Sequence, residues 1–405
     1  MSRNSEDSDL QYFETREVSE VGASALRGLV VHEWMASIGG SEKVVESILK
    51  AFPGSDLFCL WKDANLSLPP EWNVLESSLS RSFIKGSKAS ALPVMPIVWR
   101  QGAKAIEQPE FVLISSHLFA HHFRLEQAWH VPKLVYVHTP ARYIWAPQYD
   151  PRGKSIAARM ASLLFKPLDR MRASESHAIV SNSEFVRARV REAWQRESDV
   201  IYPPVEVTQI QRVSDWTALL TPEEQELFEK LPSEYILGAS RFVQYKALDF
   251  VLHASLEIGM PVVLAGSGPD ELRLRGVAAA LGIECHIVER PSDALLRSLY
   301  QRAALFVFPS IEDFGIMPVE AMAAGTPVIA NRVGGAAETV IAGVSGATFD
   351  TSDMRSVRKA ASAALKIDPE CVLDWSRRFS SERFEREISE WVEEQVAEFG
   401  RIRTT

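Results

Sequence analysis

The sequence predicts an α/β protein made of two doubly wound domains that face each other across a cleft. Short apolar runs alternate with helical patterns, which is typical of parallel strands with helices packed on both faces. The first series of runs covers 29–32, 111–115, 134–138 and 178–181, and the second covers 235–238, 262–265, 285–288, 305–308 and 327–330. Because ligands of such folds collect at the carboxyl ends of the strands, we expect the substrate between the domains.

The two series of strands are separated by Pro203 and Pro204, which interrupt any helix and favour an extended connector. Near the end of the chain, apolar residues recur at helical spacing from Trp375 to Val392. The predicted units are a polar, disordered tail at 1–27, an N-terminal domain at 28–205, a C-terminal domain at 206–372 and a last helix at 373–405.

Composition excludes several classes of protein. A net charge of -9 over 405 residues argues against a nucleic-acid partner, which needs a broad basic surface. The three cysteines, Cys59, Cys285 and Cys371, are far apart and lack metal-ligand spacing, so we expect reduced thiols and a cytoplasmic location. Residues 1–27 have no signal-peptide pattern, and no apolar run is long enough to span a bilayer.

Two glutamates separated by seven residues, Glu312 and Glu320, flank a predicted strand-to-helix junction. At the start of that helix, the amides of Gly315, Ile316 and Met317 have no intrahelical carbonyl to bond, and the helix dipole adds positive charge. Such a helix start binds anions. The carboxylates on either side can accept hydrogen bonds from hydroxyls, so the segment suits a nucleotide sugar, which carries hydroxyls on both sides of its diphosphate.

Two glycine pairs also follow predicted strands. Gly39 and Gly40 open a helix, and Gly266 and Gly268 form a Gly-x-Gly-Pro turn. Because glycine lacks a Cβ, the backbone at these positions can approach a ligand closely. Taken alone, the first pair fits an ordinary strand-to-helix turn better, and the second fits a tight turn as well as a ligand contact. Neither pair has the three-glycine pattern of dinucleotide-binding proteins. An NAD-dependent oxidoreductase is therefore the least favoured of the functions considered for this chain.

Two cations, Arg241 and Lys246, follow the first strand of the second domain. A departing nucleoside diphosphate gains negative charge as the glycosidic bond breaks, and fixed cations stabilise that transition state. Taken alone, such a residue is usually a solvated surface charge. In the first domain, His138 ends a strand, where it is either a structural residue or a polar contact to the substrate.

The ordered series of these motifs resembles the retaining glycosyltransferases of family 4, also called group 1, whose signature is a glutamate pair separated by seven residues. Similar landmarks run from Gly39 to a Gly-Gly-x-x-Glu run that ends at Glu338. The resemblance implies a GT-B fold of two Rossmann-like domains, with the last helix crossing back to the first domain. The segment 136–149 is most similar to bacterial mannosyltransferases of surface-polysaccharide assembly. This similarity implies GDP-mannose as donor and a lipid-linked or polysaccharide acceptor.

The resemblance also assigns roles to residues. Glu320 would hold the ribose hydroxyls, and Glu312 and His138 would contact the donor sugar. The family usually has glycine after its lysine, where this chain has Ala247. The residues assigned to catalysis are His138, Arg241, Lys246 and Glu312, and those assigned to donor binding are Gly39, Gly40, Gly266, Gly268, Phe314, Gly315, Ile316, Met317 and Glu320. No metal or other cofactor is expected, since helix amides and two cations supply the positive charge and no Asp-x-Asp pair follows a strand.

Two alternatives remain open for the function. The donor can be a UDP-sugar, because these motifs do not read the base, or the chain can be a catalytically silent nucleotide-sugar-binding protein.

Two basic segments also carry apolar residues, and they either contact anionic membrane at the inner face of the plasma membrane or form solvated helix faces. Their cations are Arg81, Lys85, Lys88, Arg100 and Lys104 in the first segment and Arg152, Lys154, Arg159, Lys166, Arg170 and Arg172 in the second.

Overall fold

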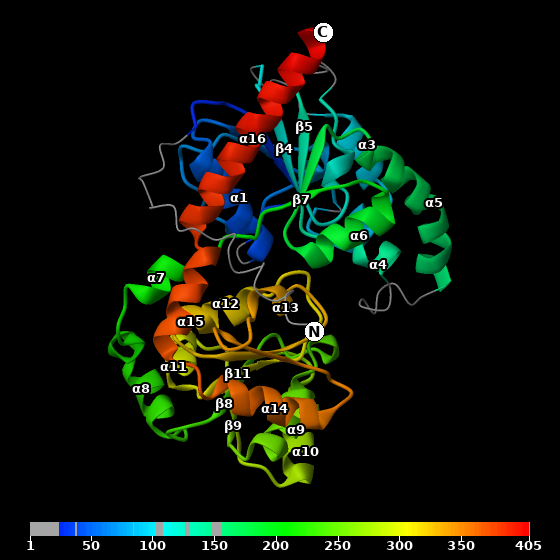
Figure 1. The fold of residues 1–405 in the computed structure, drawn as a ribbon. Coiled ribbons are helices and arrows are strands. Elements are labelled where there is room, and N and C mark those ends of the chain that lie inside the picture. Colours follow the sequence, from blue (N-terminus) through cyan, green and yellow to red (C-terminus); the bar gives the residue numbers. More distant parts are fainter. Residues whose placement is uncertain are drawn as a thin grey trace, which may run out of the picture.

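The computed structural model describes residues 24–36, 39–83, 85–102, 108–125, 130–146 and 156–404. Two α/β domains lie one above the other, with the C-terminal helix running along the N-terminal domain (Figure 1). Each domain contains one sheet of parallel strands flanked by helices, as the alternating pattern predicted.

The N-terminal sheet has the strand order β3-β2-β1-β4-β5-β6-β7. Its strands are β1 (Leu29–His32), β2 (Asp56–Cys59), β3 (Val74–Glu76), β4 (Val112–Ser116), β5 (Lys133–Val137), β6 (Ala178–Ser181) and β7 (Asp199–Val200). The helices of this domain are α1 (Gly40–Ala51), η1 (Ser78–Arg81), α2 (Lys88–Ala91), α3 (Met95–Arg100), η2 (Ala120–His122), α4 (Arg142–Trp145), α5 (Ile156–Ala173) and α6 (Glu184–Trp194). Four strands match the predicted runs, whereas the sequence pattern missed β2, β3 and β7.

The C-terminal sheet has the order β10-β9-β8-β11-β12-β13. Its strands are β8 (Ile236–Ala239), β9 (Val262–Gly266), β10 (Cys285–Glu289), β11 (Leu305–Phe308), β12 (Val328–Asn331) and β13 (Gly346–Phe349). The remaining helices are α7 (Val207–Gln211), η5 (Trp216–Leu219), α8 (Pro222–Glu229), η6 (Gln244–Lys246), α9 (Leu248–Ile258), α10 (Glu271–Leu281), α11 (Asp293–Arg302), α12 (Ile316–Ala323), α13 (Ala336–Thr339), α14 (Met354–Ala364), α15 (Pro369–Ser376), η7 (Arg377–Phe379) and α16 (Ser381–Thr404). All five runs of the second series are strands, and β13 was missed.

Two chain segments cross side by side between the domains. Val205 pairs with Ser380 in a parallel bridge, and its amide donates to the carbonyl of Phe379 at 3.0 Å. Beyond this crossing, α16 packs against α1, and its apolar face joins the core of the N-terminal domain (Figure 1). The residues of that face are Phe384, Ile388, Trp391 and Val392, whereas Trp375 and Phe379 pack in the C-terminal domain. The last helix therefore joins the two domains.

Residues 1–23 of the predicted tail lie outside the described part of the chain. Ser24 is buried and donates a hydrogen bond to Glu393 at 2.6 Å, so the chain is already packed against α16 at this point. Cys59, Cys285 and Cys371 are unpaired. Among the described residues, no helix combines the length and the apolar character that a membrane crossing requires.

Candidate active site

Four loops meet at the carboxyl edge of the C-terminal sheet, because β9, β8, β11 and β12 are neighbours in it. Gly266 and Gly268 have φ values of +140° and +156°. A Cβ at Gly266 would overlap the carbonyl oxygen of Ser240, and one at Gly268 would overlap that of Phe242. The Gly-x-Gly-Pro turn therefore needs its glycines to pack against the loop that carries Arg241 and Lys246.

The loop after β11 places Glu312 beside Lys246, and the two side chains form an ion pair. They keep 23% and 12% of their surfaces exposed, respectively, so both remain accessible to a ligand. Ser310 fixes the lysine loop by donating a hydrogen bond to the carbonyl of Lys246 at 2.8 Å. Arg241 lies on the same loop, is exposed and donates to the hydroxyl of Tyr245 at 2.7 Å. The structure thus brings together Glu312 and Lys246, two residues that the sequence predicted separately.

The N-terminus of α12 is built for an anion. Gly315 is the N-cap at φ +97°, and no side chain caps the helix. A Cβ added to Gly40, the first residue of α1, would lie 2.7 Å from the side chain of Ile316, the first residue of α12. Gly39 is the uncapped N-cap of α1. Two helix N-termini from different domains therefore meet, and both dipoles favour negative charge between them.

Glu320 lies inside α12 and accepts a hydrogen bond from Tyr300 at 3.4 Å. Burial raises the pKa of Glu320 above its ordinary value, although the charge of Lys43 on α1 opposes this shift. The ring of Phe314 is buried, at 5.7 Å from the ring of Tyr202 and 6.0 Å from that of Phe379. Phe314, predicted as a donor-binding residue, thus has its side chain in the core beside the domain crossing.

His138 follows β5 at the facing edge of the N-terminal sheet. Its Nε2 is 2.8 Å from the hydroxyl of Ser115, and its amide donates to the carbonyl of Ser116 at 2.9 Å. Burial lowers the pKa of His138 well below its ordinary value, so the ring is neutral at pH 7. Within the described residues, these hydrogen bonds hold His138 in its own domain and none joins it to Glu312.

Asp313 is an interdomain residue that sequence reasoning missed. Its carboxylate accepts Nε of Arg142 at 2.9 Å and NH1 of Arg189 at 2.5 Å, and its carbonyl accepts the hydroxyl of Ser183. All three partners belong to the N-terminal domain, on or beside α4 and α6. The residue next to Glu312 therefore fixes one domain to the other.

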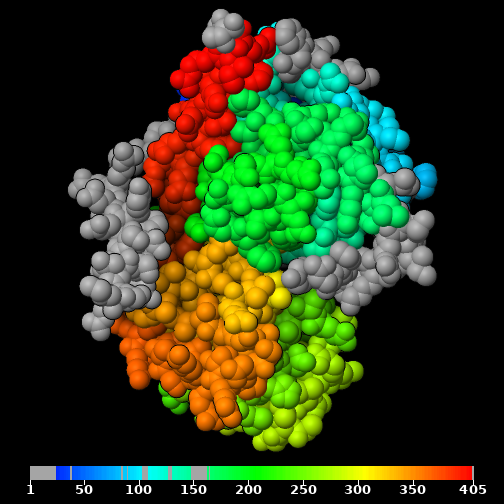
Figure 2. Space-filling view, turned by 45° about the vertical axis from the view of Figure 1, so that its right-hand side comes forward, coloured from blue at the N-terminus to red at the C-terminus, as the bar shows by residue number. Residues whose placement is uncertain are grey.

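Glu338 makes a second contact of this kind. Its two oxygens accept the amides of Glu184 and Phe185 at 2.8 and 2.7 Å, and so cap α6 from the other domain. In Figure 2 the green segment of the N-terminal domain lies directly against the yellow and orange segments of the C-terminal domain. We call the contacts of Asp313 and Glu338 the interdomain latch. Glu338 ended a motif that the sequence showed, but its partners 154 and 153 residues away could not be read from it.

Comparison with known proteins gives the site a context. Residues 221–378 match the family model described as "Glycosyl transferases group 1". The D-inositol 3-phosphate glycosyltransferase of Mycolicibacterium smegmatis is 38% identical over 153 residues, which are 34% of this chain and 35% of that protein. The GDP-mannose-dependent alpha-(1-6)-phosphatidylinositol monomannoside mannosyltransferase of the same organism is 31% identical over 150 residues, 33% of this chain and 39% of that protein. The chain thus spans less than two fifths of the length of these relatives.

The whole fold also has solved counterparts. The crystal structure of HepE from Anabaena in complex with UDP superimposes with a TM-score of 0.65 and 16% identity, over 91% of this chain and 100% of that chain. This likeness confirms the predicted GT-B fold of two Rossmann-like domains.

Proposed function

We propose that this chain, a member of the group 1 glycosyltransferases, transfers a hexose from a nucleotide sugar to a lipid-linked or polysaccharide acceptor with retention of configuration. One observation carries the proposal. The N-terminus of α1, from the N-terminal domain, lies against the N-terminus of α12, which shares the edge of the C-terminal sheet with the Lys246–Glu312 pair. Amides, helix dipoles and a cation are thereby aimed at one place from both domains, which is what a departing diphosphate requires.

The chemistry follows from the charges. Glu312 and Lys246 form an ion pair within the site. A bound donor would contact both residues. Its phosphates would bind the ammonium of Lys246, and a sugar hydroxyl would donate a hydrogen bond to Glu312. As the glycosidic bond breaks, negative charge grows on the diphosphate, and Lys246, Arg241 and the helix amides stabilise it more than they stabilise the ground state. Glu320, which lies inside α12, is proposed to accept hydrogen bonds from the ribose hydroxyls.

This positive charge also supports transfer without a metal cofactor. A divalent cation in other transferases neutralises the diphosphate, and here the lysine, the arginine and two helix N-termini offer that neutralisation. Activity that persists in EDTA, after dialysis against the chelator, is the expected result. Loss of activity that Mg²⁺ or Mn²⁺ restores would contradict this part of the proposal.

GDP-mannose is the donor we propose. The support is the similarity to a relative named as GDP-mannose-dependent, together with the motif resemblance of the segment 136–149. A UDP-sugar is the second candidate, because a solved structure with the same fold, HepE, contains UDP. Thermal-shift assays with GDP-mannose, GDP, UDP-glucose and UDP separate the two, and hydrolysis of each donor provides a catalytic readout. We expect stabilisation by both guanosine compounds only. Stabilisation by UDP alone would transfer the assignment to the second candidate.

The acceptor side of the proposal rests on an exposed face of the N-terminal domain. Phe83 is fully exposed (100%), and Ile97, Leu163 and Met171 keep 64%, 65% and 50% of their surfaces in solvent. α3 and α5, which carry three of these residues, lie on the same side of the domain (Figure 1). Together with the cations of both segments, such a face suits the anionic inner surface of a plasma membrane and a cytoplasmic, peripheral enzyme.

Part of the basic charge on this face is already paired. Glu175 binds Arg100 at 2.7 Å and Arg172 at 2.6 Å, which weakens the attraction to lipid. Lys166 and Arg170 lie over the ring of Trp145, beside a cavity of about 460 Å³. Of the predicted cations, Lys104, Arg152 and Lys154 lie outside the described residues, and the side chain of Arg159 is also not described.

Vesicle sedimentation tests the membrane contact. We expect binding to vesicles containing phosphatidylglycerol at low salt and none to pure phosphatidylcholine. The double variant Phe83→Ser, Met171→Ser should bind less, whereas Leu272→Ser is a matched control, because Leu272 is 84% exposed on the other domain. Equal sedimentation of both variants would contradict the assignment of this face.

A further inference from the structure

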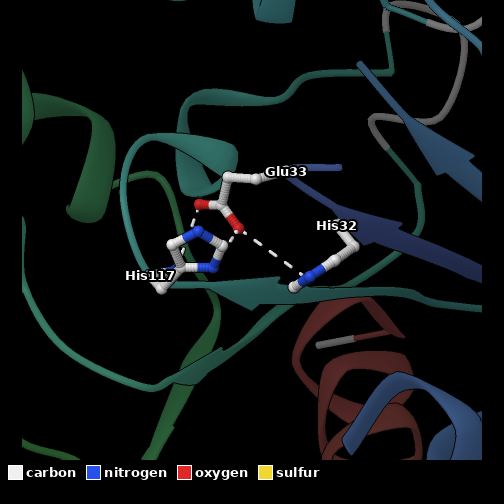
Figure 3. A group of neighbouring side chains, drawn as sticks. All are labelled: His32, Glu33 and His117. Atoms are coloured by element: carbon white, nitrogen blue, oxygen red, sulfur yellow. Dashed lines mark hydrogen bonds and ion pairs between the residues drawn. The ribbon is translucent and has the colours of Figure 1, made fainter. Parts of the chain in front are cut away.

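Four chemically active side chains gather at the carboxyl edge of the N-terminal sheet. His32 ends β1 and is followed by Glu33, whereas His117 follows β4 and His138 follows β5. Because β1, β4 and β5 are neighbours in the sheet, these residues converge although the sequence separates them. Figure 3 shows the carboxylate of Glu33 between the rings of His117 and His32.

Glu33 is fully buried and is held by a set of hydrogen bonds. One oxygen accepts the amides of His117, Leu118 and Ala120 at 3.0, 2.8 and 3.0 Å. The other lies 3.1 Å from Nδ1 of His117 and 3.7 Å from Nδ1 of His32. Burial alone would raise the pKa of Glu33, but its electrostatic contact with His117, 3.1 Å away, outweighs burial and lowers the pKa below the ordinary range. Glu33 is therefore a buried carboxylate.

The carboxylate fixes the ring of His117. Nδ1 lies 3.1 Å from the carboxylate of Glu33, so the ring is turned with Nε2 on the side away from Glu33. The ring of Trp34 packs edge-on against it at 4.9 Å. His117 keeps 23% of its side chain exposed, and within the described residues no hydrogen bond reaches its Nε2. A carboxylate–histidine pair with one open nitrogen is thus present at the sheet edge that faces the donor site.

The neighbouring histidines differ from His117. The side chain of His32 is fully buried, and its Nδ1 lies 3.1 Å from both the carbonyl and the hydroxyl oxygen of Ser115. Nε2 of His138 is taken by the same hydroxyl. Burial lowers the pKa of both His32 and His138, so both rings are neutral. His117 is therefore the partly exposed member of the cluster whose ring lies against the carboxylate.

A purely structural role explains this arrangement poorly. Burying an isolated carboxylate is costly, and packed apolar residues in place of a buried ion pair are often equally or more stabilising. The three amides could be satisfied by a neutral side chain, whereas the second oxygen of Glu33 is used to hold one half-buried ring. Groups held at such a cost cluster at functional sites.

We propose that His117, positioned by Glu33, binds the acceptor substrate through a hydrogen bond between its Nε2 and one of the acceptor's hydroxyls. This inference rests on the proposed transfer function and identifies the side of the site that the acceptor occupies. The ligand class is a sugar or polyol. The choice of acceptor over donor follows from location, because the diphosphate-binding elements Lys246, Glu312 and α12 all belong to the other domain.

Transfer kinetics test the proposal, with methyl α-D-mannopyranoside as the acceptor probe at saturating GDP-mannose. Loss of one hydrogen bond predicts that His117→Ala lowers the slope of rate against probe concentration by about tenfold. The affinity for GDP, measured by calorimetry, should stay unchanged, because Lys246 and Glu312 belong to the other domain. His117→Gln, which keeps an acceptor atom near the position of Nε2, should recover part of the slope. Glu33→Gln should lower the slope as well, because a neutral amide loses the charge contact that positions the His117 ring.

His122→Gln is the matched control. It changes a buried histidine of the same domain whose Nε2 bonds to Asp169 at 3.0 Å, and it should lower the melting temperature without changing the slope for the probe. Equal slopes in wild type and His117→Ala, or a parallel loss of affinity for GDP, would overturn the proposal. If wild type hydrolyses no donor, the proposed function itself fails. In that case ¹⁵N NMR of the His117 ring still decides this inference, since a probe-dependent shift of the Nε2 signal is required.

The same spectra distinguish a metal site. His32, Glu33 and His117 have ligand atoms within 4.8 Å of one another. The contacts of Nδ1 of His32 with Ser115 argue for a hydrogen-bonded cluster. A stoichiometric metal found by elemental analysis of the purified protein, with both Nδ1 atoms unprotonated, would replace the acceptor assignment by a metal site.

Discussion

Replacing Asp313 by alanine should lower kcat/KM for transfer by roughly a hundredfold through loss of the interdomain latch. The carboxylate bonds to Arg142 and Arg189, whose side chains are 24% and 12% exposed. Hydrogen bonds to charged groups contribute about 1.5 to 3 kcal/mol each, and this partial exposure argues for the lower end. Two contributions of about 1.5 kcal/mol sum to about 3 kcal/mol, and each 1.4 kcal/mol is a factor of ten.

The loss of activity is expected because the interdomain latch holds together the two parts of the proposed site, one from each domain. Asp313 adjoins Glu312, and its partners belong to the N-terminal domain, which also contributes the N-terminus of α1. Without the latch, the arrangement that places both helix N-termini at one diphosphate becomes less populated. Small-angle X-ray scattering should show a larger radius of gyration for Asp313→Ala with GDP-mannose than for wild type, and the kinetic loss should appear in the same samples.

Variants of the partners separate the latch from a local effect on Glu312. Arg142→Ala and Arg189→Ala alter the other domain. Each should lower kcat/KM about tenfold, and combining either with Asp313→Ala should lower it by less than the product of the separate losses. Asp374→Ala is the control. Asp374 also pairs with an arginine, Arg377, but its side chain is 66% exposed, and an exposed pair contributes little, so this variant should keep wild-type activity. Wild-type rates in both arginine variants, together with an inactive Asp313→Ala, would show that Asp313 acts through Glu312 and not through the interdomain latch.

Three further predictions concern the donor site and the core. Lys246→Ala should lower kcat by about a hundredfold, as expected for one preorganised charge contact, and full activity in a steady-state assay would contradict the donor-site assignment. Gly268→Ala should weaken donor binding in calorimetry, because the new Cβ overlaps the carbonyl of Phe242 at φ +156°, and unchanged affinity would show that the turn is not needed. Burial lowers the pKa of His122 to about 4, below its value of 6.5 in the unfolded chain, so the unfolded state binds an extra proton between these pH values. The free energy of unfolding should therefore be intact above about pH 6.5 and fall by about 3 kcal/mol towards pH 4, and urea titrations should show a flatter pH dependence for His122→Phe.

Much of the fold could be predicted from short stretches of sequence. Runs such as 305–308 are apolar throughout and end in loop residues, so each reads as a buried parallel strand. The missed strands lack this signal. β3 has three residues and β7 has two, and β2 begins with Asp56, whose carboxylate accepts a hydrogen bond from Asn73. Their strand conformation comes from pairing with neighbours.

The helix start and the two glutamates of the proposed donor site could be predicted from the sequence, because they are local. Gly315, the start of α12 and both glutamates lie within nine residues of the chain, and backbone geometry over such a distance is set by the residues themselves. The other contacts depend on how distant segments are brought together. Asp313 meets Arg142 and Arg189 across 171 and 124 residues, and Glu33 meets His117 across 84. Those contacts exist because strand order and the crossing of two domains bring distant loops together, and no local pattern encodes that order.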